Sequence, residues 1–155
     1  MNNSKTKEAH DMHLNIEISR TISLAYSAVC KPLCKDLNLP QTAFDILMFL
    51  GNNPAYKTAS EIVEIRHIKA NLVSMYVDRL VKEGFLARKE DPNDRRRTLL
   101  LFTGKAQPVI EKGKMVQEEF LQSLFENTEK ESKENFLKIL NVISRNMDRM
   151  IRAEE

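Results

Sequence analysis

Apolar residues recur along most of the chain at the spacing of an amphipathic helix. Over residues 11–35 they return every three or four positions and predict one long helix, which Pro32 should kink or break locally. The same spacing predicts five further helices, over residues 40–51, 59–65, 69–83, 104–127 and 130–153. The pattern is therefore that of a mainly α-helical protein.

Local signals mark several of these helix ends. The segment Thr58-Ala59-Ser60-Glu61 matches a capping box, in which a hydroxyl and a carboxylate three residues apart satisfy free backbone N–H groups. Gly84 is suited to the left-handed residue that ends a helix. Thr103 is a candidate cap for the helix over residues 104–127, although Pro108 should disturb its first turns.

The helical pattern is interrupted over residues 85–103. Two short apolar runs there flank a turn that carries Pro92 and Asn93, which predicts a β-hairpin. The tip of this hairpin holds three consecutive arginines directly after an aspartate, namely Asp94, Arg95, Arg96 and Arg97.

Three adjacent guanidinium groups would repel one another without a polyanion nearby, so this tip indicates binding to nucleic acid. Side chains alternate along a strand, so Arg95 and Arg97 should point one way and Arg96 the other. We expect one or two of them to reach the narrow minor groove, where the potential is most negative. Asp94 should hold an arginine in a fixed pose through a charge-assisted bond.

Two short helices joined by a tight turn and followed by a hairpin predict a winged helix-turn-helix over residues 40–103. In the helix over residues 69–83, Val73, Val77 and Leu80 should face inward. The opposite face is then available to a DNA groove and carries Lys69, Ala70, Asn71, Ser74 and Met75. The alternative for this face is an ordinary solvated helix surface, and the cationic hairpin favours the DNA interpretation.

The last helix carries apolar residues at the spacing 4-3-4-3, in Phe136, Leu140, Ile143, Met147 and Met150. Such a seam packs best against another helix, and the alternative is a stripe that faces the chain's own core. We expect the helices over residues 11–35 and 104–154 to build a dimer base. Ile18 and Ile22 would join the seam.

Composition fits one soluble domain over residues 1–155, with 42% hydrophobic and 30% charged residues. Residues 57–105 contain eleven Lys and Arg against seven Asp and Glu, a net charge of +4, whereas the remainder has a net charge of −2. Arg79, Lys82, Arg88 and Lys89 belong to this basic region and fit either phosphate contacts or ordinary surface charge.

No run of 18 apolar residues occurs, so no membrane contact is expected. The first residues lack the apolar core of a signal peptide, which favours the cytoplasm.

The segment from Ile68 to Arg88, the run Glu90-Asp91-Pro92-Asn93-Asp94-Arg95-Arg96 and the alternating Leu99, Leu101 and Thr103 together resemble the MarR family of bacterial transcriptional regulators. The resemblance implies a homodimer with interlocked terminal helices that binds a pseudo-palindromic operator in double-stranded DNA, usually as a repressor. It also implies release by a small aromatic ligand or an oxidant. The family often has serine where Ala70 or Asn71 stands, so operator preference is not transferred.

A ligand pocket in this architecture would lie between the dimer base and the winged region, with Tyr26, Phe44, Met48 and His67 as candidate lining residues for a small apolar or aromatic effector. Plain core packing is the alternative for each. Cys30 and Cys34 are expected to be inert, partly buried thiols.

No catalytic arrangement or phosphate-cradling glycine loop is apparent, so neither an enzyme nor a cofactor is expected. His10, Asp11 and His13 lack a third well-spaced partner, so no metal site is expected. The alternative function is an antirepressor-like module that keeps this fold but binds a regulator protein in place of DNA. Its mark would be loss of positive charge at the hairpin tip, which this sequence retains.

Overall fold

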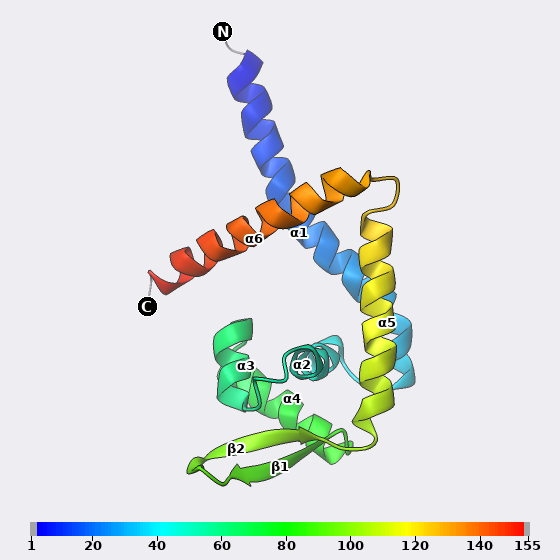
Figure 1. The fold of residues 1–155 in the computed structure, drawn as a ribbon, viewed down its shortest axis with the longest axis vertical. Coiled ribbons are helices and arrows are strands. Elements are labelled where there is room, and N and C mark those ends of the chain that lie inside the picture. Colours follow the sequence, from blue (N-terminus) through cyan, green and yellow to red (C-terminus); the bar gives the residue numbers. More distant parts are fainter. Residues whose placement is uncertain (1–2, 154–155) are drawn as a thin grey trace. The chain divides into compact units, whose positions relative to one another are not determined.

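The computed structural model describes the backbone of residues 3–153 and the side chains of residues 17–153 (Figure 1). The described residues form six helices and one two-stranded antiparallel hairpin, which confirms the predicted fold class. In chain order the elements are α1 (Asn3–Asp36), α2 (Gln41–Asn52), α3 (Ala59–Arg66), α4 (Ala70–Lys82), β1 (Leu86–Asp91), β2 (Asp94–Phe102), α5 (Ala106–Leu124) and α6 (Lys130–Arg152).

The chain divides into two compact units, Met1–Glu118 and Glu119–Glu155, so that α5 begins in the first unit and ends in the second. None of the helices that the structure describes is both long and apolar enough to cross a membrane.

The core of the first unit is built around α2, which has seven buried residues among its twelve. Ile46 and Leu47 of α2 pack with Val77 and Leu80 of α4, and Ile110 of α5 joins the same cluster. Ile62 of α3 and Phe85, Leu86 and Leu100 of the hairpin base complete it. Burial of these side chains removes apolar surface from water, which is the main stabilising contribution in a domain of this size. The core therefore joins the two short helices and the hairpin base into one body.

The predicted ends of α3 and α4 are confirmed. The Thr58 side chain accepts a hydrogen bond from the Glu61 N–H, and the Glu61 carboxylate accepts one from the Thr58 N–H, which completes the capping box. His67 adopts the left-handed conformation in the tight turn between the two helices, with φ of 51°. Gly84 follows α4 with φ of 77°, a conformation that glycine adopts without steric cost.

The structure differs from the sequence prediction at three helix positions. α1 starts at Asn3 and continues through Pro32 to Asp36, so the predicted break is absent. Burial of the neighbouring Cys34, and of Leu33 in part, in a packed cluster stabilises the last turn of α1. Pro108 is the third residue of α5, where the backbone N–H has no intrahelical partner to lose, and it does not disrupt the helix.

Thr103 has a different role from the predicted helix cap. Its hydroxyl donates a hydrogen bond to the Gly84 carbonyl at 2.6 Å, and the Phe85 carbonyl lies 3.3 Å from the same oxygen. The Thr103 N–H also donates to the Phe85 carbonyl, at 3.1 Å. Thr103 therefore ties the end of β2 to the segment that follows α4.

The hairpin is regular at its base and irregular near its tip. Leu86 pairs with Phe102 and Glu90 with Thr98, and the register then shifts between Glu90 and Asp91. Beyond its pairing with β1, strand β2 is held by a hydrogen bond of 2.7 Å from the Leu100 N–H to the Lys57 carbonyl, directly before α3. The hairpin base is thus attached to the helix-turn-helix by main-chain bonding as well as by apolar packing.

In the second unit, α6 has no buried residue. The seam residues are exposed by between 43% (Leu140) and 69% (Met150) of their surface, and Ile18 and Ile22 of α1 are exposed too. The stripe therefore does not face a core within the described residues, which disfavours the alternative left open by the sequence.

Replacing Thr58 by Ala should lower the free energy of unfolding by about 1 kcal/mol, because the Glu61 N–H loses its side-chain acceptor at the start of α3. Chemical denaturation monitored by circular dichroism measures this. Ser60→Ala is the matched control, since Ser60 is an exposed hydroxyl in the same first turn. Equal stability of the two variants would contradict the capping assignment.

Candidate nucleic-acid interface

One face of α4 is built as the sequence predicted. Val73, Val77 and Leu80 are buried against the core. The opposite side chains are all exposed, and they are Lys69, Ala70, Asn71, Ser74 and Met75. The exposed face begins at the N-terminal end of α4, directly after the left-handed turn at His67 that joins α3 to α4. The geometry is that of a helix that can enter a groove.

The N-terminal end of α4 is suited to a phosphate group. Lys69 is the N-cap residue, and its side chain makes no capping hydrogen bond. The first turn contains no acidic residue. Backbone N–H groups and the helix dipole give such an end a partial positive charge, to which the Lys69 ammonium adds a full one.

At the hairpin tip, Asp94 holds Arg96 as predicted. The Asp94 Oδ1 atom accepts hydrogen bonds from Arg96 Nε at 3.2 Å and from the Arg96 N–H at 3.0 Å. These bonds, with the side-chain one as the larger contribution, lower the pKa of the Asp94 carboxyl. The Arg96 side chain is still 91% exposed, and Arg95 is exposed beside it. Both guanidinium groups are therefore accessible to a duplex.

Arg97, which the sequence grouped with the other two arginines, has ion-pair partners in the protein. Its guanidinium lies 3.1 Å from Glu61 Oε1 on α3 and 3.7 Å from Asp91 Oδ2 at the end of β1, and its side chain is 47% exposed. Desolvation tends to raise the pKa of Glu61, yet hydrogen bonds from Lys57 and Thr58 and the charge of Arg97 lower it overall. The sequence identified Glu61 as a capping residue but carried no signal for this second role.

Of the four further cations that the sequence singled out as phosphate contacts or surface charge, two have partners in the protein. Arg79 donates to the Asn38 carbonyl at 2.7 Å, and Arg88 forms an ion pair with Asp78. Lys82 and Lys89 are exposed. Arg79 and Arg88 thus bond to other residues of the protein, whereas the two lysines are available to a polyanion.

The residues predicted to line a ligand pocket fall into two places. Phe44 and Met48 are buried and form one packed cluster with Cys30 and Cys34, against which Tyr26 packs. Tyr26 accepts a hydrogen bond from Gln117 at 2.8 Å, and burial raises the pKa of its hydroxyl. His67 lies outside this cluster, exposed in the turn between α3 and α4. Phe44 and Met48 are therefore core residues, which was the alternative to a pocket lining.

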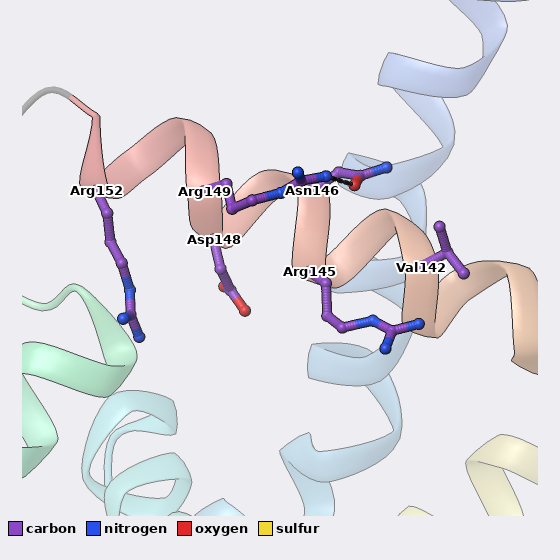
Figure 2. Close-up of a pocket in the computed structure, with 6 residues that line it drawn as sticks. All are labelled: Val142, Arg145, Asn146, Asp148, Arg149 and Arg152. Atoms are coloured by element: carbon purple, nitrogen blue, oxygen red, sulfur yellow. Dashed lines mark hydrogen bonds between the residues drawn. The ribbon is translucent and has the colours of Figure 1, made fainter.

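Two open cavities lie elsewhere on the described surface. One, of about 490 Å³, lies between the first turn of α3 and β2 and is lined by residues that include Ser60, Glu64, Arg96 and Arg97. The other is a recess along α6, and Figure 2 shows that all six of its lining residues come from that single helix, with Arg149 bonded to Asn146. A recess bordered by one helix has no opposing wall to enclose a ligand.

Among the described side chains, no three His, Cys, Asp or Glu residues are placed to hold a metal ion. The side chains of His10, Asp11 and His13 lie outside the described residues.

Comparison with known families agrees with this geometry. Residues 37–97, from the end of α1 to the arginines of the hairpin, match the model of the MarR family. Over this segment the chain is similar to the MarR family. The resemblance seen in the sequence is thereby confirmed, and the hairpin is the wing of a MarR-type winged helix-turn-helix.

The chain is also similar to individual proteins. It is 40% identical over 50 residues to an uncharacterised HTH-type transcriptional regulator, YcgE, of Bacillus subtilis (strain 168), and the match covers 32% of each protein. Among solved structures, a MarR protein from Peptoclostridium difficile is 23% identical, with a TM-score of 0.77 and coverage of 87% of this chain and 88% of that one. A putative MarR family regulator from Listeria monocytogenes, solved with a 26mer DNA, is 20% identical, with a TM-score of 0.77 and coverage of 85% and 87%.

The two cysteines of the buried cluster should resist alkylation in the folded protein at about pH 8. Burial raises the pKa of both thiols, that of Cys34 to about 11, so the reactive thiolate is scarce and shielded. Mass spectrometry after iodoacetamide treatment should show no label on native protein and two labels after denaturation. Rapid labelling of the native protein would contradict this assignment.

Proposed function

We propose that this protein is a cytoplasmic, sequence-specific DNA-binding regulator that represses transcription by occupying a pseudo-palindromic operator as a homodimer. One observation carries the proposal: an exposed polar helix face and an exposed arginine pair stand on one MarR-type winged helix-turn-helix. The solved relative from Listeria monocytogenes was captured with DNA, which supports the same role for this fold here.

In the proposed complex α4 lies in the major groove. Asn71 can both donate to and accept from a base edge, and Ser74 can bond to a base or a phosphate. Ala70 and Met75 would lie against thymine methyl groups, and Lys69 would neutralise a phosphate. The small side chains at this end of α4 allow the helix to approach the base edges closely.

The wing would enter the adjoining minor groove through Arg95 and Arg96. Asp94 limits the freedom of the Arg96 guanidinium, so less conformational entropy is lost when it binds. A narrow minor groove has an enhanced negative potential, which favours such an arginine over neutral groups.

Homodimerisation is proposed because no residue of the apolar seam of α6 is buried among the residues that the structure describes. The exposed residues Phe136, Ile143 and Met147 together present a continuous apolar face, which a soluble protein ordinarily covers. A two-fold axis would place the two α4 helices in successive major grooves, about one helical turn apart.

The alternative of an antirepressor-like module is less well supported. Such a module has no use for cations at the wing tip, whereas Arg95 and Arg96 are both retained and exposed. Gel-shift titration with the DNA upstream of the protein's own coding region, at several salt concentrations, separates the two functions. Binding that is specific and steeply salt-dependent supports the regulator, because cationic side chains displace counterions condensed on DNA.

Replacing Arg95 or Arg96 by Ala should weaken operator binding by about 1–3 kcal/mol and reduce the salt slope by about 1, since each change removes one minor-groove cation. Fluorescence anisotropy with a labelled operator measures both quantities. Arg145→Ala is the control, because it removes an exposed arginine of α6, outside the winged region. Unchanged affinity in both wing variants would refute the wing assignment.

Replacing Ile143 by Glu should convert the protein from dimer to monomer, because a carboxylate at the centre of the seam cannot be buried without a partner. Analytical ultracentrifugation should give twice the chain mass of 17.9 kDa for the parent protein and a single chain mass for the variant. Lys138→Glu, on the opposite side of the helix, should remain dimeric. A parent protein that sediments as a monomer would exclude the dimer.

A further inference from the structure

We propose that Arg97 and Glu61 form a positioning pair that fixes the orientation of the wing relative to α3, and that Arg97 is not a DNA-contacting residue. The pair would act on DNA binding through Arg95 and Arg96, which it holds at a set angle. Its effect on DNA rests on the proposed function, whereas its effect on the wing itself does not.

The Glu61 carboxylate bonds to the start of α3 with one oxygen and to the wing with the other. Its Oε2 atom accepts hydrogen bonds from the Lys57 N–H at 2.7 Å and the Thr58 N–H at 2.9 Å. Its Oε1 atom accepts from Arg97 Nη2 at 3.1 Å. Because Oε2 is fixed to the start of α3, the carboxylate is a rigid acceptor, and the Arg97 guanidinium is bound to a fixed point of the helix-turn-helix.

The Arg97 guanidinium also lies close to a second carboxylate, that of Asp91. Arg97 Nη1 lies 3.7 Å from Oδ2 of Asp91, a residue only 8% exposed. The Oδ1 atom of Asp91 accepts from the Asn93 N–H at 2.9 Å, which forms the turn of the wing. Arg97 thus bridges the start of α3 and the turn of the hairpin.

Within the part of the chain that the structure describes, few other contacts attach the outer half of the wing. Leu100 bonds to Lys57, and Leu100 and Leu86 are buried, but these contacts lie at the hairpin base. A two-stranded hairpin is marginally stable on its own. The cavity of about 490 Å³ between α3 and β2 separates the two elements where Arg97 and Glu61 line it, so the packing there is open. Arg97 is therefore the contact that extends the attachment toward the tip.

Charge separates Arg97 from its neighbours. Arg97 faces two carboxylates, so the local sum is negative, and moving its guanidinium to a phosphate would leave the largely buried Asp91 without that cation. Arg96 faces a single, partly exposed aspartate and keeps 91% of its side chain exposed. The Arg97 guanidinium is therefore shared between two protein carboxylates, whereas most of the Arg96 guanidinium stays accessible to DNA.

The experiment compares Arg97→Ala, Arg97→Lys and Glu61→Gln with Arg95→Ala in the full-length protein. Gln preserves the capping box, because its side-chain oxygen still accepts backbone N–H groups, but it removes the charge that attracts Arg97. Arg95→Ala is the matched control, since it removes a neighbouring exposed guanidinium that forms no ion pair with any carboxylate of residues 17–153. Circular dichroism verifies that each variant is folded.

The first readout needs no DNA. Hydrogen exchange of the β2 amides should accelerate by about two- to five-fold in Arg97→Ala and Glu61→Gln, the range expected for one ion pair of this exposure. Arg95→Ala should leave exchange unchanged, and Arg97→Lys should restore part of the protection. A variant that combines Arg97→Ala with Glu61→Gln should exchange no faster than Arg97→Ala alone, because both changes remove the same contact. Unchanged exchange in both single variants, or additive effects in the double variant, would overturn the positioning pair.

The second readout is operator affinity against salt. Arg97→Ala and Glu61→Gln should weaken binding by a similar factor of about two to five at every salt concentration, with an unchanged slope. Arg95→Ala should lower the slope by about 1. A lowered slope in Arg97→Ala together with normal affinity in Glu61→Gln would show that Arg97 contacts DNA and would overturn the inference. Absence of specific binding by the parent protein would instead reject the proposed function, and the exchange experiment would still decide the pair.

Discussion

Attachment of the hairpin to the start of α3 is the constraint on which the proposed interface depends. Two strands cannot hold an orientation by themselves, because their backbone bonds are exposed to water and their apolar faces are small. Here β2 is joined to the residues before α3 by a main-chain bond at Leu100, by apolar packing at the base and by the Arg97 ion pair. The same short segment, Lys57 to Glu61, also caps α3. One stretch of chain therefore orients both the helix-turn-helix and the wing.

This arrangement explains why three consecutive arginines need not be equivalent. Asp94 restrains Arg96 without covering it, Arg95 is exposed, and Arg97 is divided between Glu61 and Asp91. The three guanidinium groups therefore differ in how many protein acceptors they contact and in how far they are exposed to water. In our proposal, Arg95 and Arg96 bind the polyanion, and the adjacent Arg97 fixes the position of the wing that carries them.

The two apolar surfaces of the chain have opposite environments. The cluster around α2 is closed, with Phe44, Ile46 and Leu47 almost fully buried. The seam of α6 is open along its length, and α6 has no buried residue at all. A helix with one apolar face and one charged face is stable in water only when a partner covers the apolar one. This contrast supports a second copy of the chain as the partner in the proposed homodimer.

The order and kind of nearly all elements were determined by the sequence alone. Helical spacing, the capping box at Thr58, Gly84 after α4 and the hairpin with its arginines each report a local preference that the fold preserves. The exposed face of α4 was predictable for the same reason, since period 3.6 separates buried from solvated positions. The family resemblance followed from this winged segment.

Only the tertiary structure decided which polar groups meet across the sequence. Glu61 and Arg97 are 36 residues apart, and Thr103 bonds to Gly84 across 19 residues. His67 lies apart from Phe44 and Met48, and Pro32 stays inside α1 because the cluster around Cys34 stabilises that turn. Periodicity and capping signals describe a residue's own element. Partners of a charged or hydroxyl group depend on how elements pack, which local patterns do not encode.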